Sequence, residues 1–414
     1  MSVLFQHLKL LHQGKFSKPQ SYTLSKGELV PVDAAVDPST FSKVIDCSKW
    51  LGSKGWIDLR CGLGEPGQEY RETVASLCAS LAQSGFSKAV ILPNTDPVIQ
   101  SKTEVTFLMS KAEKFAQELV LTGAVTKNTS GEDLTEMLDM HFQSGIQIFG
   151  DGTKPLSHTD RYLKVLQYLQ KIDGLLFDHA YDPLLAIFGQ MHEGEVSTKL
   201  GMRGIPNLAE EVAIQRNLEL IRYTGGRVHF QTLSTAKGVD LIRKAKAEGL
   251  RVTADISIYQ LIFSDQDLTT FDTRLKVKPP FRGKEDREAL VQGLKDGTID
   301  ALVSNHQPQE VDAKFCEFDL ASFGMSGLQT FLPAMGILAE ELGWELLLEK
   351  ITSGPEKILG ESKPSWTLFD PHALWVYDEK SNASLSSNHP WFGKQLKGKV
   401  TYCLQKGQLL QVNG

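Results

Sequence analysis

The chain has 414 residues, of which 41% are hydrophobic and 23% charged, the balance of an ordinary globular protein rather than of a disordered one. Its net charge of −6 gives no basic footprint, and no apolar run approaches the roughly 18 residues of a membrane span, so we expect neither a nucleic-acid partner nor a membrane. Five scattered cysteines without a CxxC pair and a start without a signal-peptide cleavage site predict a cytoplasmic location.

The first segment of the chain has the character of β structure. Residues 21–32 (SYTLSKGELVPV) and 41–47 (FSKVIDC) are β-rich runs with turn residues between them. The end of the chain is alike, with WTLFD, LWVYD and GKVTYCLQKGQLLQV separated by Gly and Asn turns. We therefore predict that residues 1–54 and 361–414 pair with each other into one small β-sandwich domain.

Between these ends the sequence alternates strand and helix signals. Eight β-rich runs lie at 56–60, 88–92, 119–125, 145–149, 174–179, 227–231, 250–256 and 300–304. Clear helical periodicity covers 69–83, 101–117, 208–223, 237–248 and 285–295. Strands that alternate with helices imply parallel pairing through right-handed crossovers. Eight such units predict an α/β fold, a (β/α)8 TIM barrel over residues 55–360.

The active site of such a barrel lies at the carboxyl ends of its strands. A hydrolytic metal site would need about four or more His, Asp, Glu or Cys ligands that converge there. The strand ends supply few of them, and the donors that we single out are Asp151, His179 and His306. The pattern therefore predicts a weak, open site at best.

Several motifs resemble those of the dihydroorotases, members of the amidohydrolase superfamily. Residues 58–67 (DLRCGLGEPG) are similar to the family signature D-x-H-x-H-x-R-x-P-G, and residues 93–98 (PNTDPV) to its PNTxPV segment. Further similar segments follow in the family order at 179–180, 204–206, 233–236, 276–280, 296–300, 322–327 and 397–400. The resemblance implies a zinc-dependent hydrolase of pyrimidine biosynthesis that interconverts carbamoyl aspartate and dihydroorotate, with metals that activate a bound water.

The same resemblance implies that most metal ligands are lost. The His-x-His pair, a later His and the final acid–base Asp fall on Arg60, Gly62, Thr232 and Asn305. Asp151 and His179 stay as remnant positions. A guanidinium repels a dication, glycine and threonine offer no useful ligand, and an amide cannot take a proton from water as a carboxylate does. We therefore expect a degenerate pseudoenzyme, for which we assign no catalytic residue and expect no cofactor.

The family's substrate-binding positions are also altered. In this chain they are Gly64 in place of Arg, the retained Asn94, Lys278 in place of Asn, the retained His306, and Gln309 in place of His. Structural roles explain the remnants as well. We expect His179 to be hydrogen-bonded within the barrel, Asn94 and His306 to hold loops, and Cys61 to face the helix layer because strand neighbours point to opposite sides. Arg60 should point into the barrel and bond Asp151, since it would otherwise leave that carboxylate unpaired.

Three functions stay open at this point. The favoured one is a non-catalytic structural or regulatory subunit, a homo-oligomer or a partner of aspartate transcarbamoylase, because inactive family members assemble with that enzyme. The second is an active cyclic-amide hydrolase with a site rebuilt on Asp151, His179 and either His229 or His306. The third is a small-molecule binding protein that uses Asn94 and Lys278. Metal content separates the first two, and co-purification with a partner separates the first from the third.

Overall fold

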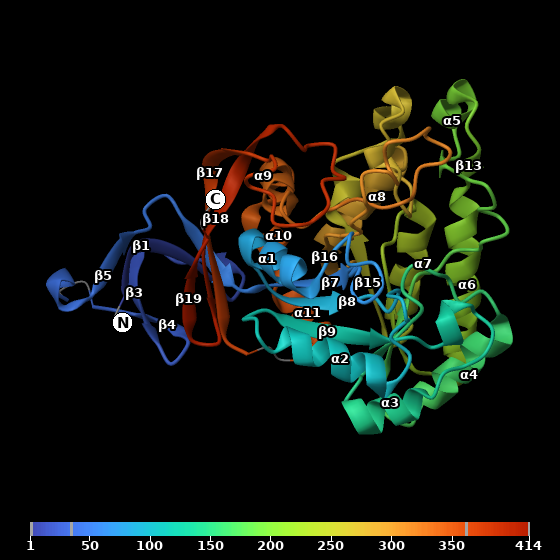
Figure 1. Cartoon of the computed structure of the whole chain (residues 1–414), viewed down its shortest axis with the longest axis horizontal. Coiled ribbons are helices and arrows are strands. Elements are labelled where there is room, and N and C mark those ends of the chain that lie inside the picture. The colour runs from blue at the N-terminus through green and yellow to red at the C-terminus, as the bar shows by residue number, and fades with distance from the viewer. Residues whose placement is uncertain (1–2, 34–35, 361–362, 413–414) are drawn as a thin grey trace.

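The protein, a computed structural model that describes residues 3–33, 36–360 and 363–412, combines a barrel with a β domain (Figure 1). The barrel wall is a parallel sheet of eight strands in the order β16-β15-β14-β11-β10-β9-β8-β7. They are β7 (Trp56–Cys61), β8 (Phe86–Ile91), β9 (Glu118–Gly123), β10 (Ile148–Phe149), β11 (Leu175–Asp178), β14 (Arg227–Phe230), β15 (Val252–Ser257) and β16 (Ala301–Val303). Beside the first strand, the Gly62 amide donates to the His306 carbonyl at 2.7 Å and closes the ring. The predicted barrel is confirmed.

Helices cover the outside of this wall. The longer ones are α1 (Val74–Ser84), α2 (Lys102–Ala112), α3 (Met137–Ser144), α4 (Thr159–Gln170), α6 (Asn207–Thr224), α7 (Ala236–Ala247), α8 (Lys284–Lys295) and α9 (Phe331–Leu342). Shorter elements are α5 (Glu195–Leu200), α10 (Trp344–Glu349), α11 (Ser353–Leu359) and the parallel pair β12 (Met191–His192) and β13 (Gly204–Ile205). Single 3-10 turns lie at Pro38–Thr40, Lys127–Thr129, Ile258–Leu261, Asp265–Thr270 and Thr273–Leu275.

Local sequence signals set several helix ends. The Thr235 hydroxyl accepts from the Gly238 amide at 3.0 Å and caps α7. Thr73 caps α1 in the same way, so this helix begins five residues after the predicted start at residue 69. The preceding residues form a loop instead, in which the Gly64 amide donates to the Glu72 carbonyl at 3.1 Å.

The interior of the barrel is apolar at its amino-terminal end. It is filled by Ile57, Leu59, Val90, Ile148, Leu175, Phe177, Ala301 and Val303. A register shift between Asp58 and Cys61 interrupts the strict alternation of β7. As a result both Leu59 and Arg60 belong to the interior, while Cys61 packs in the outer core with Leu77 of α1. The expectation that Cys61 faces the helix layer is confirmed.

Strands from both ends of the chain share one further sheet, seen in blue and red in Figure 1. Its order is β19-β18-β17-β6-β1-β3-β4, and β2 and β5 also pair with β1. The strands are β1 (Val3–His12), β2 (Lys15–Phe16), β3 (Gln20–Ser25), β4 (Glu28–Pro31), β5 (Lys43–Asp46), β6 (Leu51–Lys54), β17 (Ser365–Val376), β18 (Gln395–Gln405) and β19 (Gln408–Gln411). The two chain ends thus form the predicted β-sandwich, and they share a core that includes Phe5, Leu8, Leu368 and Tyr402.

The C-terminal segment also reaches the barrel. Residues 377–394, which connect β17 to β18 and which we call the strap, contact barrel loops through Ser384 and Asn388. The domain limits at residues 54 and 360 remain predictions, and residues 361–362 lie outside the described part. No described helix has the length and apolar character that crossing a membrane requires.

Candidate functional site

Arg60 lies at the centre of the carboxyl end of the barrel, and its side chain is fully buried at 0% exposure. Its Nε donates to Asn305 Oδ1 at 3.0 Å, one Nη donates to Gln231 Oε1, and the other reaches the Gly152 carbonyl at 3.3 Å. Burial lowers the pKa of Arg60 to about 10, and the carboxylates of Asp255 and Asp58 oppose that change. Arg60 therefore points inward as predicted and remains charged at neutral pH.

The predicted bond between Arg60 and Asp151 is wrong. Asp151 Oδ1 accepts from the backbone amides of Val125 at 3.1 Å and Thr126 at 3.0 Å, and Oδ2 accepts from the Thr126 hydroxyl. Burial raises the pKa of Asp151 to about 6 against these hydrogen bonds. The segment after β9 satisfies this carboxylate locally, and Arg60 bonds the carbonyl of the neighbouring Gly152 instead of Asp151.

His179 and Thr232 lie side by side on two neighbouring strands. His179 Nδ1 and Thr232 Oγ1 are 3.2 Å apart, which confirms the expectation of a histidine bonded within the barrel. Burial, with the charges of Arg60 and Lys278, holds the pKa of His179 well below its usual value, so the imidazole is neutral. Thr232 has φ 53° and Asn305 has φ 47°, both in the left-handed region that residues with Cβ rarely adopt.

Glycines stand where the resemblance implies a second histidine and an arginine. A Cβ on Gly64 would lie 2.2 Å from the Gln68 carbonyl oxygen, too close for any side chain without a backbone shift. A Cβ on Gly62 would lie 3.0 Å from the His306 carbonyl oxygen, which is tight but less severe. A side chain at position 64 would therefore require a backbone shift in this loop, whereas one at position 62 would require its neighbours to move only slightly.

A cavity of about 550 Å³ opens above Arg60. Of the residues singled out from the sequence, Arg60, Gly62, Gly64, Asn94, His179, Lys278 and Gln309 line it. Thr232 instead borders a smaller neighbouring pocket, together with His179 and Lys278. The strand ends thus bring most of the expected pocket residues together. The cavity that these residues line is rich in cationic and amide side chains.

Asn94 holds loops as the sequence predicts, and Gln309, for which no such role was predicted, does the same. Asn94 Nδ2 donates to the Asp151 carbonyl at 3.0 Å, and its Oδ1 accepts from the Thr153 amide at 2.8 Å. Gln309 Nε2 donates to the Phe323 carbonyl at 3.0 Å. Both amides therefore fasten loops around the cavity through backbone hydrogen bonds.

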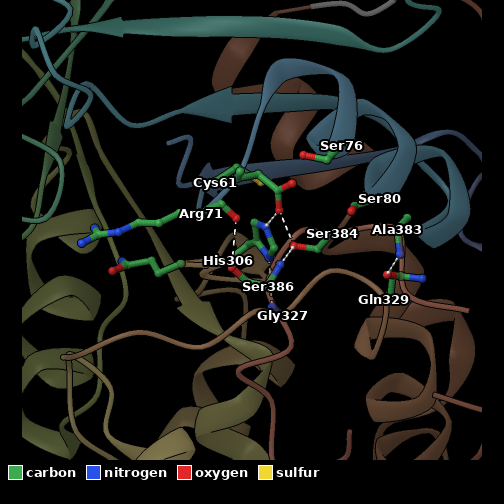
Figure 2. A network of polar contacts seen from close by, with 12 residues as sticks. Cys61, Arg71, Ser76, Ser80, His306, Gly327, Gln329, Ala383, Ser384 and Ser386 are labelled. Atoms are coloured by element: carbon green, nitrogen blue, oxygen red, sulfur yellow. Dashed lines mark hydrogen bonds and ion pairs between the residues drawn. The ribbon is translucent and has the colours of Figure 1, made fainter. Parts of the chain in front are cut away.

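His306 belongs to a buried network beside the cavity (Figure 2). Its Nδ1 accepts from the Gly327 amide at 3.1 Å, so Nε2 carries the proton and donates to Glu72 at 3.2 Å. The Ser384 hydroxyl of the strap also donates to Glu72. His306 holds loops, as expected. Sequence reasoning missed Glu72, because an exposed-looking acid in a loop gives no sign of a partner more than two hundred residues away.

His229 has both ring nitrogens engaged inside the barrel wall. Its Nε2 lies 2.8 Å from Asp255 Oδ2, and its Nδ1 lies 2.8 Å from the Thr253 hydroxyl. Asp255 also accepts from the Thr232 amide at 2.6 Å. This pair therefore supports the backbone at Thr232 and does not face the cavity.

The residues present do not fit a zinc centre. Four of the six implied ligand positions carry a guanidinium, a glycine, a hydroxyl and an amide, none of which is a good zinc ligand. The candidates for a rebuilt site are each engaged elsewhere, as shown above for Asp151, His229 and His306. Within the described ranges, no three His, Cys, Asp or Glu side chains are grouped so that they could hold a metal ion.

Comparisons with known proteins agree with this architecture. A family model described as dihydro-orotase-like matches residues 51–238. The dihydroorotase of Syntrophus aciditrophicus is 34% identical over 399 residues, which cover 94% of this chain and 93% of that relative. The dihydroorotase of Pelotomaculum thermopropionicum is 37% identical over 371 residues, 86% of each chain. The solved L-hydantoinase of Arthrobacter aurescens shares the fold, with a TM-score of 0.86 at 20% identity over 100% of this chain and 96% of that one.

Proposed function

We propose that this chain, which belongs to the dihydroorotase family of pyrimidine biosynthesis, is a non-catalytic member of that family. In this proposal it acts as a structural or regulatory subunit, and its candidate partner is aspartate transcarbamoylase. The proposal that the chain is non-catalytic rests on Arg60. This buried guanidinium is bonded to Asn305, Gln231 and the Gly152 carbonyl at the carboxyl end of the barrel.

Charge and chemistry support this proposal. A fixed cation among the implied ligand positions would repel a zinc ion placed there. Asn305 in place of the carboxylate has no basic oxygen that can take a proton from water. A Gly64 that tolerates no side chain removes the arginine that the resemblance implies for substrate binding. Each change alone would weaken the reaction, and together they leave Asn305 in the base position and only Asp151 and His179 among the implied ligands.

The surface near the cavity supports a role in assembly. Large apolar side chains are exposed on two loops of the barrel, namely Leu184, Phe188, Val311, Phe315 and Leu320. Phe315 is 88% exposed and Leu184 76%. Exposed apolar groups of this size are common at protein–protein contacts. Homo-oligomerisation of the chain would use the same kind of surface.

The decisive experiment is a dihydroorotase assay in both directions with zinc supplied, run with and without aspartate transcarbamoylase from the same organism. We expect no turnover in any arm, while the dihydroorotase of Syntrophus aciditrophicus is active in a parallel reaction. Turnover that rises with added zinc would refute the non-catalytic proposal.

The partner needs a separate measurement. We expect this chain and aspartate transcarbamoylase to elute together in size-exclusion chromatography at micromolar concentrations. If each protein elutes alone, the partner is wrong, and the non-catalytic proposal is judged only by the assay.

A further inference from the structure

We propose that the cavity above Arg60 binds a small metabolite that carries at least two negative charges, a dicarboxylate or a phosphorylated compound. Its lining includes the four cationic residues Arg60, Arg71, Lys154 and Lys278 and not one Asp or Glu. In the whole chain, acidic residues outnumber Lys and Arg by 50 to 44. Cations are therefore concentrated in this hollow against the overall balance of the protein. This inference does not depend on the absence of catalysis.

The cations of the cavity form no direct salt bridges within the described part of the chain. Among the described residues none of the four forms an ion pair with a carboxylate, and the three groups that bond Arg60 are all neutral. Arg71 Nε is buried without a hydrogen-bond partner, although its guanidinium lies 5.7 Å from the Tyr70 ring. The carboxylates of Asp255 and Asp58 act on Arg60 from beyond salt-bridge distance, so an anion in direct contact with the cations of this cavity would be stabilised.

The ammonium group of Lys278 is positioned by two aromatic rings. Its Nζ lies 5.1 Å from the centre of the Tyr181 ring and 4.8 Å from that of Phe323, and it donates no hydrogen bond within the described structure. Two aromatic faces stabilise an ammonium and fix its position without satisfying its N–H groups. Three N–H donors are thus kept available at the cavity wall.

The backbone of Arg71 is held by the strap. Its carbonyl accepts from the Ser386 hydroxyl of the strap at 2.9 Å, and Figure 2 shows its side chain running away from the Glu72–His306 network. An anchored backbone with a guanidinium free to donate is a suitable arrangement for two oxygens of a carboxylate or phosphate. The strap therefore connects the cavity to the β domain through the backbone of a cavity residue.

Size and charge together indicate the ligand class. A volume of about 550 Å³ is in the range of small-molecule sites and is too small for a folded partner. A single carboxylate would leave most of the four cations without a direct partner, whereas a ligand with two anionic groups would supply a partner to two of them. Succinate and pyrophosphate are simple probes for the two sources of such charge.

The test is isothermal titration calorimetry of the full chain with succinate, with pyrophosphate and with the neutral analogue succinamide. We expect at least one dianion to bind, more weakly as salt increases, and succinamide not to bind. Binding of succinate alone identifies a dicarboxylate ligand, and binding of pyrophosphate alone identifies a phosphorylated one. No heat of binding from either dianion at millimolar concentration would overturn the proposal.

Variants locate the binding. We expect Lys278→Met and Arg71→Gln each to raise the dissociation constant of the bound anion by about tenfold, the loss typical of one charged hydrogen bond. Lys199→Met is the matched control, because Lys199 is 70% exposed on α5 and its removal changes the net charge equally. The exposed Lys154→Gln variant serves if a buried variant fails to fold. Equal weakening by Lys199→Met, or none by the cavity variants, would refute the assigned site.

Discussion

At the scale of residues, the buried cation Arg60 decides both the chemistry and part of the stability. We expect Arg60→Met to lower the free energy of unfolding by about 1–3 kcal/mol, because Asn305, Gln231 and the Gly152 carbonyl lose their donor, and the removal of a desolvated charge offsets only part of that loss. This is less than a buried ion pair with Asp151 would give. Urea unfolding followed by circular dichroism measures it, and an unchanged or higher midpoint would contradict the bonding described here.

Restoring two histidines should not restore a reaction. We expect the Arg60→His, Gly62→His double variant to show no turnover of dihydroorotate with zinc supplied. Thr232 and Asn305 still lack a ligand and a base, and no side chain fits at Gly64. The spectrophotometric assay of dihydroorotate hydrolysis checks this. Measurable turnover by the double variant would show that two histidines suffice and would refute the argument.

Asp178 should give the protein a pH-dependent loss of stability. Burial raises its pKa to about 6, while Tyr162 and Asn217 donate hydrogen bonds to it. A carboxyl whose pKa is raised in the folded state binds its proton more tightly there, so stability falls as pH rises from about 4 to above 6. We expect Asp178→Asn, which keeps an acceptor oxygen, to gain about 1–3 kcal/mol relative to the wild type between pH 4 and pH 7.

Urea unfolding of both proteins at a series of pH values measures this difference. Asp160→Asn is the control, because Asp160 lies on the surface and its pKa is lowered, first of all by Lys164. A difference between Asp178→Asn and wild type that stays constant across this range would contradict a raised pKa.

At the scale of elements, the strap fastens the β domain to the mouth of the barrel. Asn388 donates to the Gln307 and Gly324 carbonyls, each at 3.2 Å, and accepts from the Gln309 amide at 3.2 Å. We expect Asn388→Ala to increase hydrogen exchange in residues 377–394 and to lower stability by about 1–3 kcal/mol, because three buried backbone groups lose their partner. Exchange measured by mass spectrometry tests this. Leu385→Ala, at a position 55% exposed in the same segment, should leave exchange unchanged.

At the scale of the whole molecule, an aromatic contact joins the two parts. Phe369 of β17 is fully buried, and its ring centre lies 5.5 Å from that of Trp56 in the barrel and 5.2 Å from that of Trp344. We expect Phe369→Ala to cost about 3–5 kcal/mol, typical of a large side chain removed from a core. It should also weaken the coupling of the two parts, so that near- and far-ultraviolet dichroism report different midpoints. Phe142→Ala, at 75% exposure, is the control, and coincident midpoints in Phe369→Ala would contradict such coupling.

The sequence by itself determined the architecture. Alternating strand and helix signals fixed the eight strands in order, because periodicity and caps are local properties that short segments carry. Pairing of the two chain ends also followed, since two β-rich segments beside one barrel have few other partners. The residues at positions 60, 62, 232 and 305, where the family resemblance implies metal ligands, can be read from the sequence, and that expectation required no coordinates.

Only the tertiary structure decided which partners these residues have. Asp151 bonds two backbone amides after β9, and Arg60 bonds two amide oxygens and a carbonyl, because backbone donors and a register shift in β7 set their directions. Glu72, His306 and Ser384 meet across more than three hundred residues, a closeness that no local pattern records. The cavity with four cations has the same origin, since its charges come from strand β7 and separate loops that only the closed barrel brings together.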